Sequence, residues 1–248
     1  MTIAGSPFDK LAAQYDALWT RTPIGISQRL AVWRRLDAMF RPGDRMLDLG
    51  CGTGEDALHF KSRGVEVYGI DASAAMVGVA RNRGVNAHRL AIESIADLRE
   101  EFDGAISNFG ALNCVARLED VASALAQRVR LGGCVGICLL GRACIWEMFY
   151  FAIRGNPRKA FRRFTRGKTR SSIGADVRYP SRRQVEQAFG CHFKLIGWSG
   201  IGLCVPPSYI NEFNDGTIRG FSAVDACIAH WPVLRALADH RLFIFRHL

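Results

Sequence analysis

The chain has 248 residues, of which 49% are hydrophobic and 23% are charged, a composition that excludes an intrinsically disordered protein and suits a globular one. Its formal net charge is +10, and residues 154–183 carry that whole excess, with eleven Lys or Arg against the single acid Asp176. A local excess of this kind points to one surface with an anionic partner and excludes a generally adhesive protein.

The N-terminal stretch lacks the basic and apolar regions of a signal peptide, and the apolar run 131–141 is too short to span a bilayer. We therefore expect a cytoplasmic protein, peripheral to the membrane if the basic segment contacts lipid. Residues 6–40 carry apolar side chains at helical spacing, which predicts a mostly helical start that ends at Pro42.

From residue 45 onward, short apolar runs alternate with helical patterns. The predicted strands are 45–49, 65–70, 86–90, 102–107 and 134–140, and the predicted helices are 55–62, 73–81 and 119–129. This alternation predicts an α/β fold with a Rossmann-like, doubly wound and mostly parallel sheet. Residues 131–133, Leu-Gly-Gly, predict a turn before the fifth strand.

The rhythm changes after residue 141. We expect an aromatic helix over 145–153, a basic amphipathic helix over 157–170, a helix capped at Ser181, and late strands 193–198 and 241–245 flanking a helix at 222–238. The expected organisation is a single domain, 1–248. It has a ligand-binding core, 6–140, and a helical insertion after strand five, 141–180.

Three glycines, Gly50, Gly52 and Gly54, lie between the first predicted strand and its helix. Glycine allows a sharp turn against a ligand, and the helix start offers free N–H groups to it. Asp71 ends the next strand, where an acid suits the two hydroxyls of a nucleoside ribose. The spacing G-x-G-x-G differs from the G-x-G-x-x-G of dinucleotide-binding proteins, which argues against an oxidoreductase.

The segment 46–54 resembles motif I of class I S-adenosylmethionine-dependent methyltransferases. Further resemblances to that family are carried by Asp71-Ala72-Ser73 with Met76, Phe102-Asp103 leading into Ser107-Asn108-Phe109, Leu131-Gly132-Gly133, and Phe8-Asp9 with Tyr15-Asp16. The closest likeness is to small-molecule methyltransferases of the ubiquinone and menaquinone type. The resemblance implies the class I methyltransferase fold, methyltransferase activity, and S-adenosyl-L-methionine as the cofactor.

The resemblance also implies a set of cofactor-binding residues. These are Tyr15, Asp48, Gly50, Cys51, Gly52, Asp71, Ala72, Met76, Ile92, Glu93, Asn108 and Phe109. Asp71 would bind the ribose, Met76 would pack beside the adenine, and Asn108, Phe109 and Tyr15 would border the reactive methyl group. Ala91 stands where the family often has an Asp for the adenine amino group, so Ile92 and Glu93 are expected to replace it.

The acceptor side is less defined. The aromatic residues Trp146, Phe149 and Tyr150 could cover an apolar acceptor or could simply be core. The segment 157–170, in which Phe161 and Phe164 alternate with basic residues, could be a solvated face, an anionic membrane contact or a nucleic-acid contact, with nucleic acid the less favoured partner. No residue pattern identifies a general base or a metal site.

The expected function is methyl transfer to a small, apolar or lipid-like acceptor by in-line SN2 attack. One alternative is an RNA or protein methyltransferase that uses the basic segment 154–183. Another is a non-catalytic module that only binds S-adenosylmethionine, because a fold alone does not fix a function.

Overall fold

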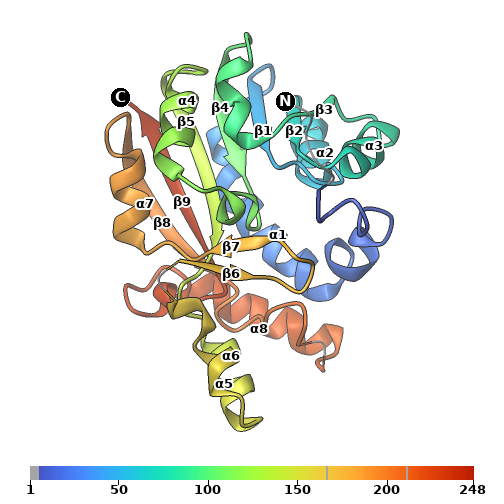
Figure 1. The fold of residues 1–248 in the computed structure, drawn as a ribbon, viewed down its shortest axis with the longest axis vertical. Helices are drawn as coiled ribbons and strands as arrows, with labels where there is room; N and C mark the ends of the chain where they lie inside the picture. The colour runs from blue at the N-terminus through green and yellow to red at the C-terminus, as the bar shows by residue number, and fades with distance from the viewer. Residues whose placement is uncertain (1–5, 166, 211) are drawn as a thin grey trace.

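The computed structural model describes residues 6–165, 167–210 and 212–248 and is built around a seven-stranded sheet (Figure 1). The strand order is β3-β2-β1-β4-β5-β9-β8. The strands are β1 (Arg45–Leu49), β2 (Glu66–Asp71), β3 (Ala87–Arg89), β4 (Phe102–Ser107), β5 (Val129–Leu140), β8 (Phe193–Ile201) and β9 (His240–His247). Only β9 runs antiparallel to its neighbours β5 and β8 in this sheet. The predicted doubly wound, mostly parallel sheet is confirmed.

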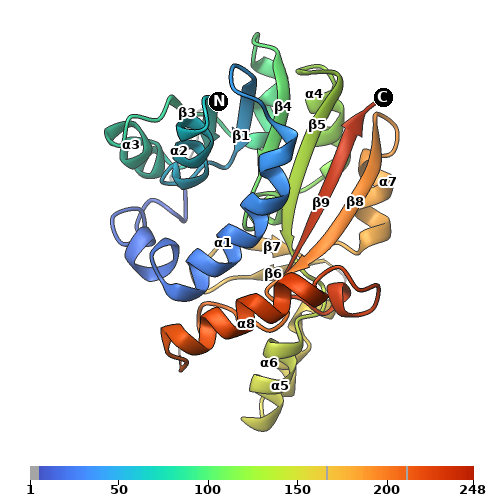
Figure 2. The ribbon, with the colours of Figure 1, turned by 180° about the vertical axis from the view of Figure 1, so that it is seen from behind.

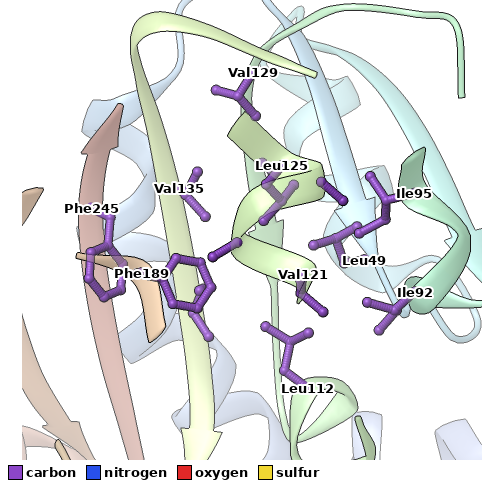
Figure 3. Close-up of a cluster of buried hydrophobic side chains, with 14 of the residues drawn as sticks. Leu49, Ile92, Ile95, Leu112, Val121, Leu125, Val129, Val135, Phe189 and Phe245 are labelled. Atoms are coloured by element: carbon purple, nitrogen blue, oxygen red, sulfur yellow. The ribbon is translucent and has the colours of Figure 1, made fainter. Parts of the chain in front are cut away.

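Helices cover both faces of the sheet, as the views from the two sides show (Figures 1 and 2). They are α1 (Pro23–Leu36), α2 (Glu55–Ser62), α3 (Ala74–Asn82), α4 (Leu118–Ala126) and α7 (Arg182–Phe189), whereas α8 (Asp215–Ile228) lies below the sheet and packs against α1. On one face, Leu49 and Val135 of the sheet pack in one cluster with Leu125 of α4 and Phe189 of α7 (Figure 3).

The opposite face is buried by α1 and α2. Met46 of β1 and Ile106 of β4 form a second core cluster there with Leu36 of α1 and Phe60 of α2. Side chains alternate between the two faces of a strand, so Met46 and Leu49 point to opposite layers. Burial on both faces explains why these strands read as continuous apolar runs rather than alternating ones.

The strand order creates a switch point between β1 and β4. The chain moves outward from β1 through β2 to β3, then returns to place β4 on the other side of β1. In open α/β sheets, ligands bind where the connections diverge, beyond the carboxyl ends of the central strands. In this protein those ends carry Gly50 after β1, Asp71 at the end of β2 and Asn108 after β4.

Shorter elements complete the chain. They are the π-helix η1 (Asp16–Thr20), the 3-10 turns η2 (Asp37–Met39), η3 (Ile92–Asp97), η4 (Ala111–Cys114), η5 (Arg162–Phe164) and η6 (Leu234–Ala236), the helices α5 (Ile145–Ile153) and α6 (Pro157–Ala160), and the hairpin strands β6 (Lys168–Arg170) and β7 (Asp176–Arg178). Helices α5 and α6 project from the lower end of the molecule in both views, with the β6–β7 hairpin between them and the sheet (Figures 1 and 2).

The predicted basic helix over 157–170 is wrong. The helix α6 has only four residues, and the chain continues through η5 into the hairpin. The physical reason is Arg163, whose side chain turns inward with 4% exposure and pairs with Glu147 and Asp239. Arg166, which was counted in the basic segment, lies outside the described residues.

Other boundaries also differ from the sequence-based expectation, among them the end of the helix predicted at 119–129, which is Leu118–Ala126. The glycines at 132–133 lie within β5 and produce an irregular register against β4 instead of a turn before the strand. The helix expected at 222–238 begins at Asp215, because the side chain of Asn214 caps it by accepting from the Thr217 N–H, and it ends at Ile228. By contrast, the capping box of Ser181 and Gln184 is confirmed.

None of the helices in the described ranges is long and apolar enough to cross a lipid bilayer.

Candidate functional site

A cavity of about 560 Å³ opens at the switch point, beyond the carboxyl ends of β1, β2 and β4. Ten of the twelve residues predicted to bind the cofactor line it. They are Tyr15, Gly50, Gly52, Asp71, Ala72, Met76, Ile92, Glu93, Asn108 and Phe109. Segments far apart in the sequence therefore meet around one cavity. The volume of this cavity suits a small organic ligand.

The glycine loop forms the floor next to β1. Gly50 and Gly52 have φ angles of +75° and +53°, in the left-handed region that favours glycine. A Cβ atom on Gly50 would lie 2.3 Å from the Cβ of Ala111, so no side chain fits there. A Cβ on Gly52 would meet no described atom within 4 Å, so the loop leaves open space at Gly52 for a ligand to approach the backbone.

Asp71 is held by two backbone amides at the end of β2. Its Oδ2 accepts from the Gly52 N–H at 3.0 Å and its Oδ1 accepts from the Ser73 N–H at 2.8 Å. Burial raises the pKa of Asp71, whereas the two amides favour the ionised form. An ionised carboxylate has about four acceptor positions, so both oxygens remain able to accept from ligand hydroxyls.

Asn108 follows β4 and is 7% exposed, yet neither its Oδ1 nor its Nδ2 has a hydrogen-bond partner within the described chain. A buried amide without partners is unfavourable by roughly 1–3 kcal/mol per group. Because Asn108 lines the cavity, a bound ligand with both a donor and an acceptor would satisfy it. Of the described residues, this is the one cavity side chain with both polar atoms buried and unpaired.

Phe109, the next residue, holds a strained backbone. Its φ angle of +52° is the only positive value among the described residues other than glycine. The ring contacts Trp19 with centroids 4.7 Å apart, and the Arg29 guanidinium lies 5.0 Å from its centre. Strain of this type persists where packing over-determines the conformation, often at ligand sites.

The N-terminal segment covers the cavity and is fastened at two points. Asp9 accepts from the Ser73 Oγ at 2.6 Å, and Asp16 accepts from the Thr53 Oγ1 at 2.7 Å. Both contacts join this segment to the starts of α3 and α2, and they place Tyr15 in the cavity wall. Burial raises the pKa of Tyr15 to about 12, so its hydroxyl stays protonated at neutral pH.

Asp48 and Cys51 do not reach the cavity wall. Asp48 points to the α1 side of β1, is 1% exposed, and has its pKa raised by burial. Cys51 packs with Ala57 and Val77 behind the glycine loop. The alternation of side chains along β1 explains the placement of Asp48, because Leu47 and Leu49 occupy the other face. Both residues thus lie beneath the glycine loop and do not line the cavity.

The aromatic residues expected at the acceptor site lie outside the cavity. The Trp146 Nε1 donates to the Cys204 carbonyl at 2.9 Å, Phe149 is 63% exposed, and the Tyr150 ring contacts the Arg154 guanidinium at 3.6 Å. Helix α5, which carries them, projects from the lower end of the molecule (Figures 1 and 2). They do not line this cavity, and the exposed Phe149 is not core, so their acceptor role stays a prediction.

The hairpin of β6 and β7, unlike these aromatic residues, lines the cavity. Residues 171 and 173–177 line the side of the cavity that faces away from β2, together with apolar side chains from η4 and β5. The hairpin turn reverses at Gly174, with a φ of +82°, and the Ser171 Oγ accepts from the Ala175 N–H at 3.0 Å. The small, turn-forming residues at 171–175 were the available sequence signal for this hairpin.

The strand order and the cavity at its switch point define the fold of class I methyltransferases. A crystal structure of an S-adenosylmethionine dependent methyltransferase from Mesorhizobium loti is similar over 87% of this chain and 97% of that chain, with a TM-score of 0.64 and 18% identity. At this identity the likeness shows the fold alone.

Comparison of sequences adds the domain type. Residues 46–133 match the family described as a methyltransferase domain. Similar curated proteins include the malonyl-[acyl-carrier protein] O-methyltransferase of Salmonella typhimurium, 37% identical over 42% of this chain, and the demethylmenaquinone methyltransferase of Mycobacterium sp. (strain KMS), 32% identical over 54% of it. The matched parts span 41% and 57% of the lengths of these two relatives. Residues 46–133 thus carry a methyltransferase domain, in a chain whose fold resembles that of S-adenosylmethionine-dependent methyltransferases, as the motifs predicted.

Proposed function

We propose that this protein binds S-adenosylmethionine in the switch-point cavity and transfers its methyl group to a small, apolar or lipid-like acceptor. The observation that carries the proposal is the meeting of Gly52, Asp71 and the unpaired Asn108 in one cavity wall. An open glycine backbone, a carboxylate and an unsatisfied amide together suit a ligand that has both ribose hydroxyls and an amino-acid end.

Each part of the wall has a proposed role in holding the cofactor. Asp71 accepts from the ribose hydroxyls, while the loop at Gly50 and Gly52 lies along the methionine portion. Asn108 binds polar atoms of the same end of the molecule. Met76, which is 2% exposed, and Ile92 flank the adenine, with Glu93 near its amino group.

For methyl transfer, the protein has to align the acceptor atom with the methyl group and to exclude water from the site. When bound, S-adenosylmethionine supplies an electrophilic methyl group, which an acceptor atom takes by in-line displacement while the sulfur keeps the electrons of the broken bond. Tyr15 and Phe109 close the cavity and keep water out. Holding two reactants in line can account for much of the barrier reduction. Because its pKa is about 12, the Tyr15 hydroxyl acts as a hydrogen-bond donor and not as a base.

The side of the cavity next to the β6–β7 hairpin, here called the acceptor wall, is apolar, which supports an apolar acceptor. Val115, Leu140, Ile173 and Val177 line this part of the cavity. The named substrates of relatives, a demethylated menaquinone and a malonyl group on a carrier protein, are consistent with small or lipid-like acceptors. We further propose that 1–248 works as one domain, because the insertion at 141–180 supplies the hairpin that completes the cavity built by 6–140.

Cofactor binding is expected to raise the melting temperature. S-adenosylhomocysteine at about 100 times its dissociation constant stabilises the folded state by about 2.7 kcal/mol, which corresponds to roughly 5–10 °C for a chain of this size. NAD is expected to produce no shift, because the loop lacks the dinucleotide spacing. Thermal denaturation with each ligand measures the difference. Stabilisation by NAD and not by S-adenosylhomocysteine would falsify the proposal.

We also propose that the projecting tip formed by α5 and α6 contacts an anionic membrane surface, where a lipid-like acceptor would be found. Phe149 and Ile153 of α5 are 63% and 64% exposed, and Phe161 after α6 is 52% exposed. The nearby cations Arg158 and Lys159 are exposed. Arg162 and Arg163, in contrast, pair with Glu147 and turn away from this surface.

Membrane contact is expected to depend on these apolar side chains. The double variant Phe149→Ser with Ile153→Ser should bind vesicles of anionic phospholipid at least about tenfold more weakly, since each loses apolar burial of more than about 1 kcal/mol. Binding of the unmodified protein should also weaken in high salt. The control is Leu131→Ser, which alters a side chain that is 75% exposed outside the insertion. Co-sedimentation with vesicles and, separately, with RNA measures both partners. RNA binding without vesicle binding would support the nucleic-acid alternative, and binding to neither would remove the membrane proposal.

A further inference from the structure

A second cavity of about 520 Å³ lies beside the first. Val115 of the segment after η4 lines both cavities, and β7 contributes to both. Residues 176 and 177 face the first cavity, whereas Arg178 and Tyr179 face the second. The buried Asn113 fixes this arrangement, because its Nδ2 donates to the Arg178 carbonyl at 2.6 Å and its Oδ1 accepts from the Leu140 N–H at 2.8 Å.

Three arginines gather at the second cavity without carboxylate partners in the described chain. Arg142 and Arg178 line it, and Arg241 lies behind it, where it donates to the Pro180 carbonyl at 2.9 Å. Arg178 has only a long contact of 3.4 Å to the Val115 carbonyl, and the side chain of Arg142 makes no hydrogen bond to any described residue.

Arg241 is the most constrained of the three. It is 5% exposed, and its Nε has no hydrogen-bond partner among the described residues. Burial and the neighbouring cations Arg142 and Arg163 lower the pKa of Arg241 to about 10. The neighbouring Arg163 is neutralised by Glu147 and Asp239, so the positive field at the cavity comes from the three guanidiniums that form no ion pair within the described chain.

Anions are therefore favoured at this position. Glu119 is the single acid among the lining residues, and its side chain is exposed to solvent, so it neutralises the arginines only weakly. A guanidinium removed from water and lacking a counter-ion is unfavourable, and bonds from arginine to carboxylate or phosphate oxygens are among the strongest available to it.

We propose that the second cavity binds an anionic oxygen group, a carboxylate or a phosphate, carried by the methyl acceptor. The inference rests on the proposed function, since it makes the two neighbouring cavities two parts of one acceptor path. The anionic group lies between Arg142 and Arg178, and the apolar body of the acceptor passes Val115 toward Asn108 and Phe109. The acceptor is then an amphiphile with an acidic end, held away from the reacting atom.

Calorimetric titration with two anions tests the site. Inorganic pyrophosphate represents the phosphate class, and octanoate represents the carboxylate class attached to an apolar chain. We expect the unmodified protein to bind one of them. Arg142→Gln and Arg178→Gln should each weaken that binding at least about tenfold, the loss of one charge-assisted contact. The Arg142 side chain makes no hydrogen bond or ion pair within the described structure, so its variant should fold normally.

The matched control is Arg219→Gln, which removes an exposed arginine of α8 that lines neither cavity. An equal loss in this variant would show that binding follows net charge alone and would overturn the proposal, as would binding of neither anion. S-adenosylhomocysteine should bind all variants with unchanged affinity. If it fails to bind the unmodified protein while the anion site behaves as expected, the proposed function fails and the anion site stands without its link to methyl transfer.

Discussion

Replacing Asp71 by Ala is expected to weaken the binding of S-adenosylhomocysteine by at least about tenfold. The carboxylate is positioned by the Gly52 and Ser73 amides at 3.0 and 2.8 Å, so it faces the cavity with little freedom. Hydrogen bonds to a charged group contribute about 1.5–3 kcal/mol each, and two ribose hydroxyls are proposed to donate to it. The substitution also releases the Gly52 N–H, which loosens the loop along the methionine portion.

Calorimetry or quenching of intrinsic fluorescence measures this affinity, and circular dichroism checks that the variant is folded. Asp97→Ala is the matched control, since Asp97 is exposed at the end of η3 and does not line the cavity. Asp71→Asn should fall between the two, because one amide oxygen can still accept. A folded Asp71→Ala variant with an unchanged dissociation constant would reduce Asp71 to a support for the backbone turn.

The core of the fold was predictable because its signals are local and repeated. Strands β1 and β4 and helix α2 begin and end where the apolar runs and the glycines place them. Parallel strands bring their carboxyl ends to one edge, so the predicted parallel sheet already placed Gly52, Asp71 and Asn108 at the same edge. The position of Tyr15 followed from the family resemblance and not from any periodic pattern.

The insertion was not predictable in the same way. Its path depends on pairs between residues far apart in the sequence, such as Arg163 with Asp239, 76 residues later. A run of basic residues does not reveal which cations are buried, and the basic composition therefore suggested a long amphipathic helix with its cations exposed. The aromatic run likewise did not show where its side chains point, because the Trp146 indole is held by the Cys204 carbonyl, far along the sequence.

The inward-facing arginines change the meaning of the basic segment. Reversing the charge at Arg162 and Arg163 would not test a membrane surface alone, because both pair with the buried Glu147. The exposed Phe149 and Ile153 test that surface without disturbing the pairs. Arg163 instead joins the insertion, through Glu147, to Asp239 in the loop that precedes β9.

Replacing Arg163 by Ala is therefore expected to destabilise the protein by about 3–5 kcal/mol at neutral pH. Removing one partner of a buried ion pair leaves charge uncompensated: Asp239 loses its arginine, and Glu147 keeps only Arg162. Arg219→Ala, at an exposed site on α8, should stay within about 0.5 kcal/mol. Arg163→Lys keeps the charge but loses the branched contacts, so it should fall between them and remain folded if the Ala variant does not.

The pH dependence of this loss identifies its cause. Burial tends to raise the pKa of both Glu147 and Asp239. Arg162 and Arg163 nevertheless hold the pKa of Glu147 below its ordinary range. His240 and Arg163 do the same for the pKa of Asp239. Carboxyl groups with lowered pKa values contribute stability above their unfolded pKa of about 4, and that stability is lost as the pH falls through the lower folded values. Without Arg163 both pKa values rise, so the buried carboxylates become protonated, and lose their charge, at a higher pH.

Urea denaturation between pH 7 and pH 4 measures this effect. The difference in the free energy of unfolding between the unmodified protein and Arg163→Ala should shrink as the pH falls. A difference that stays constant over this range would mean that lost packing, and not the ion pair, accounts for the destabilisation.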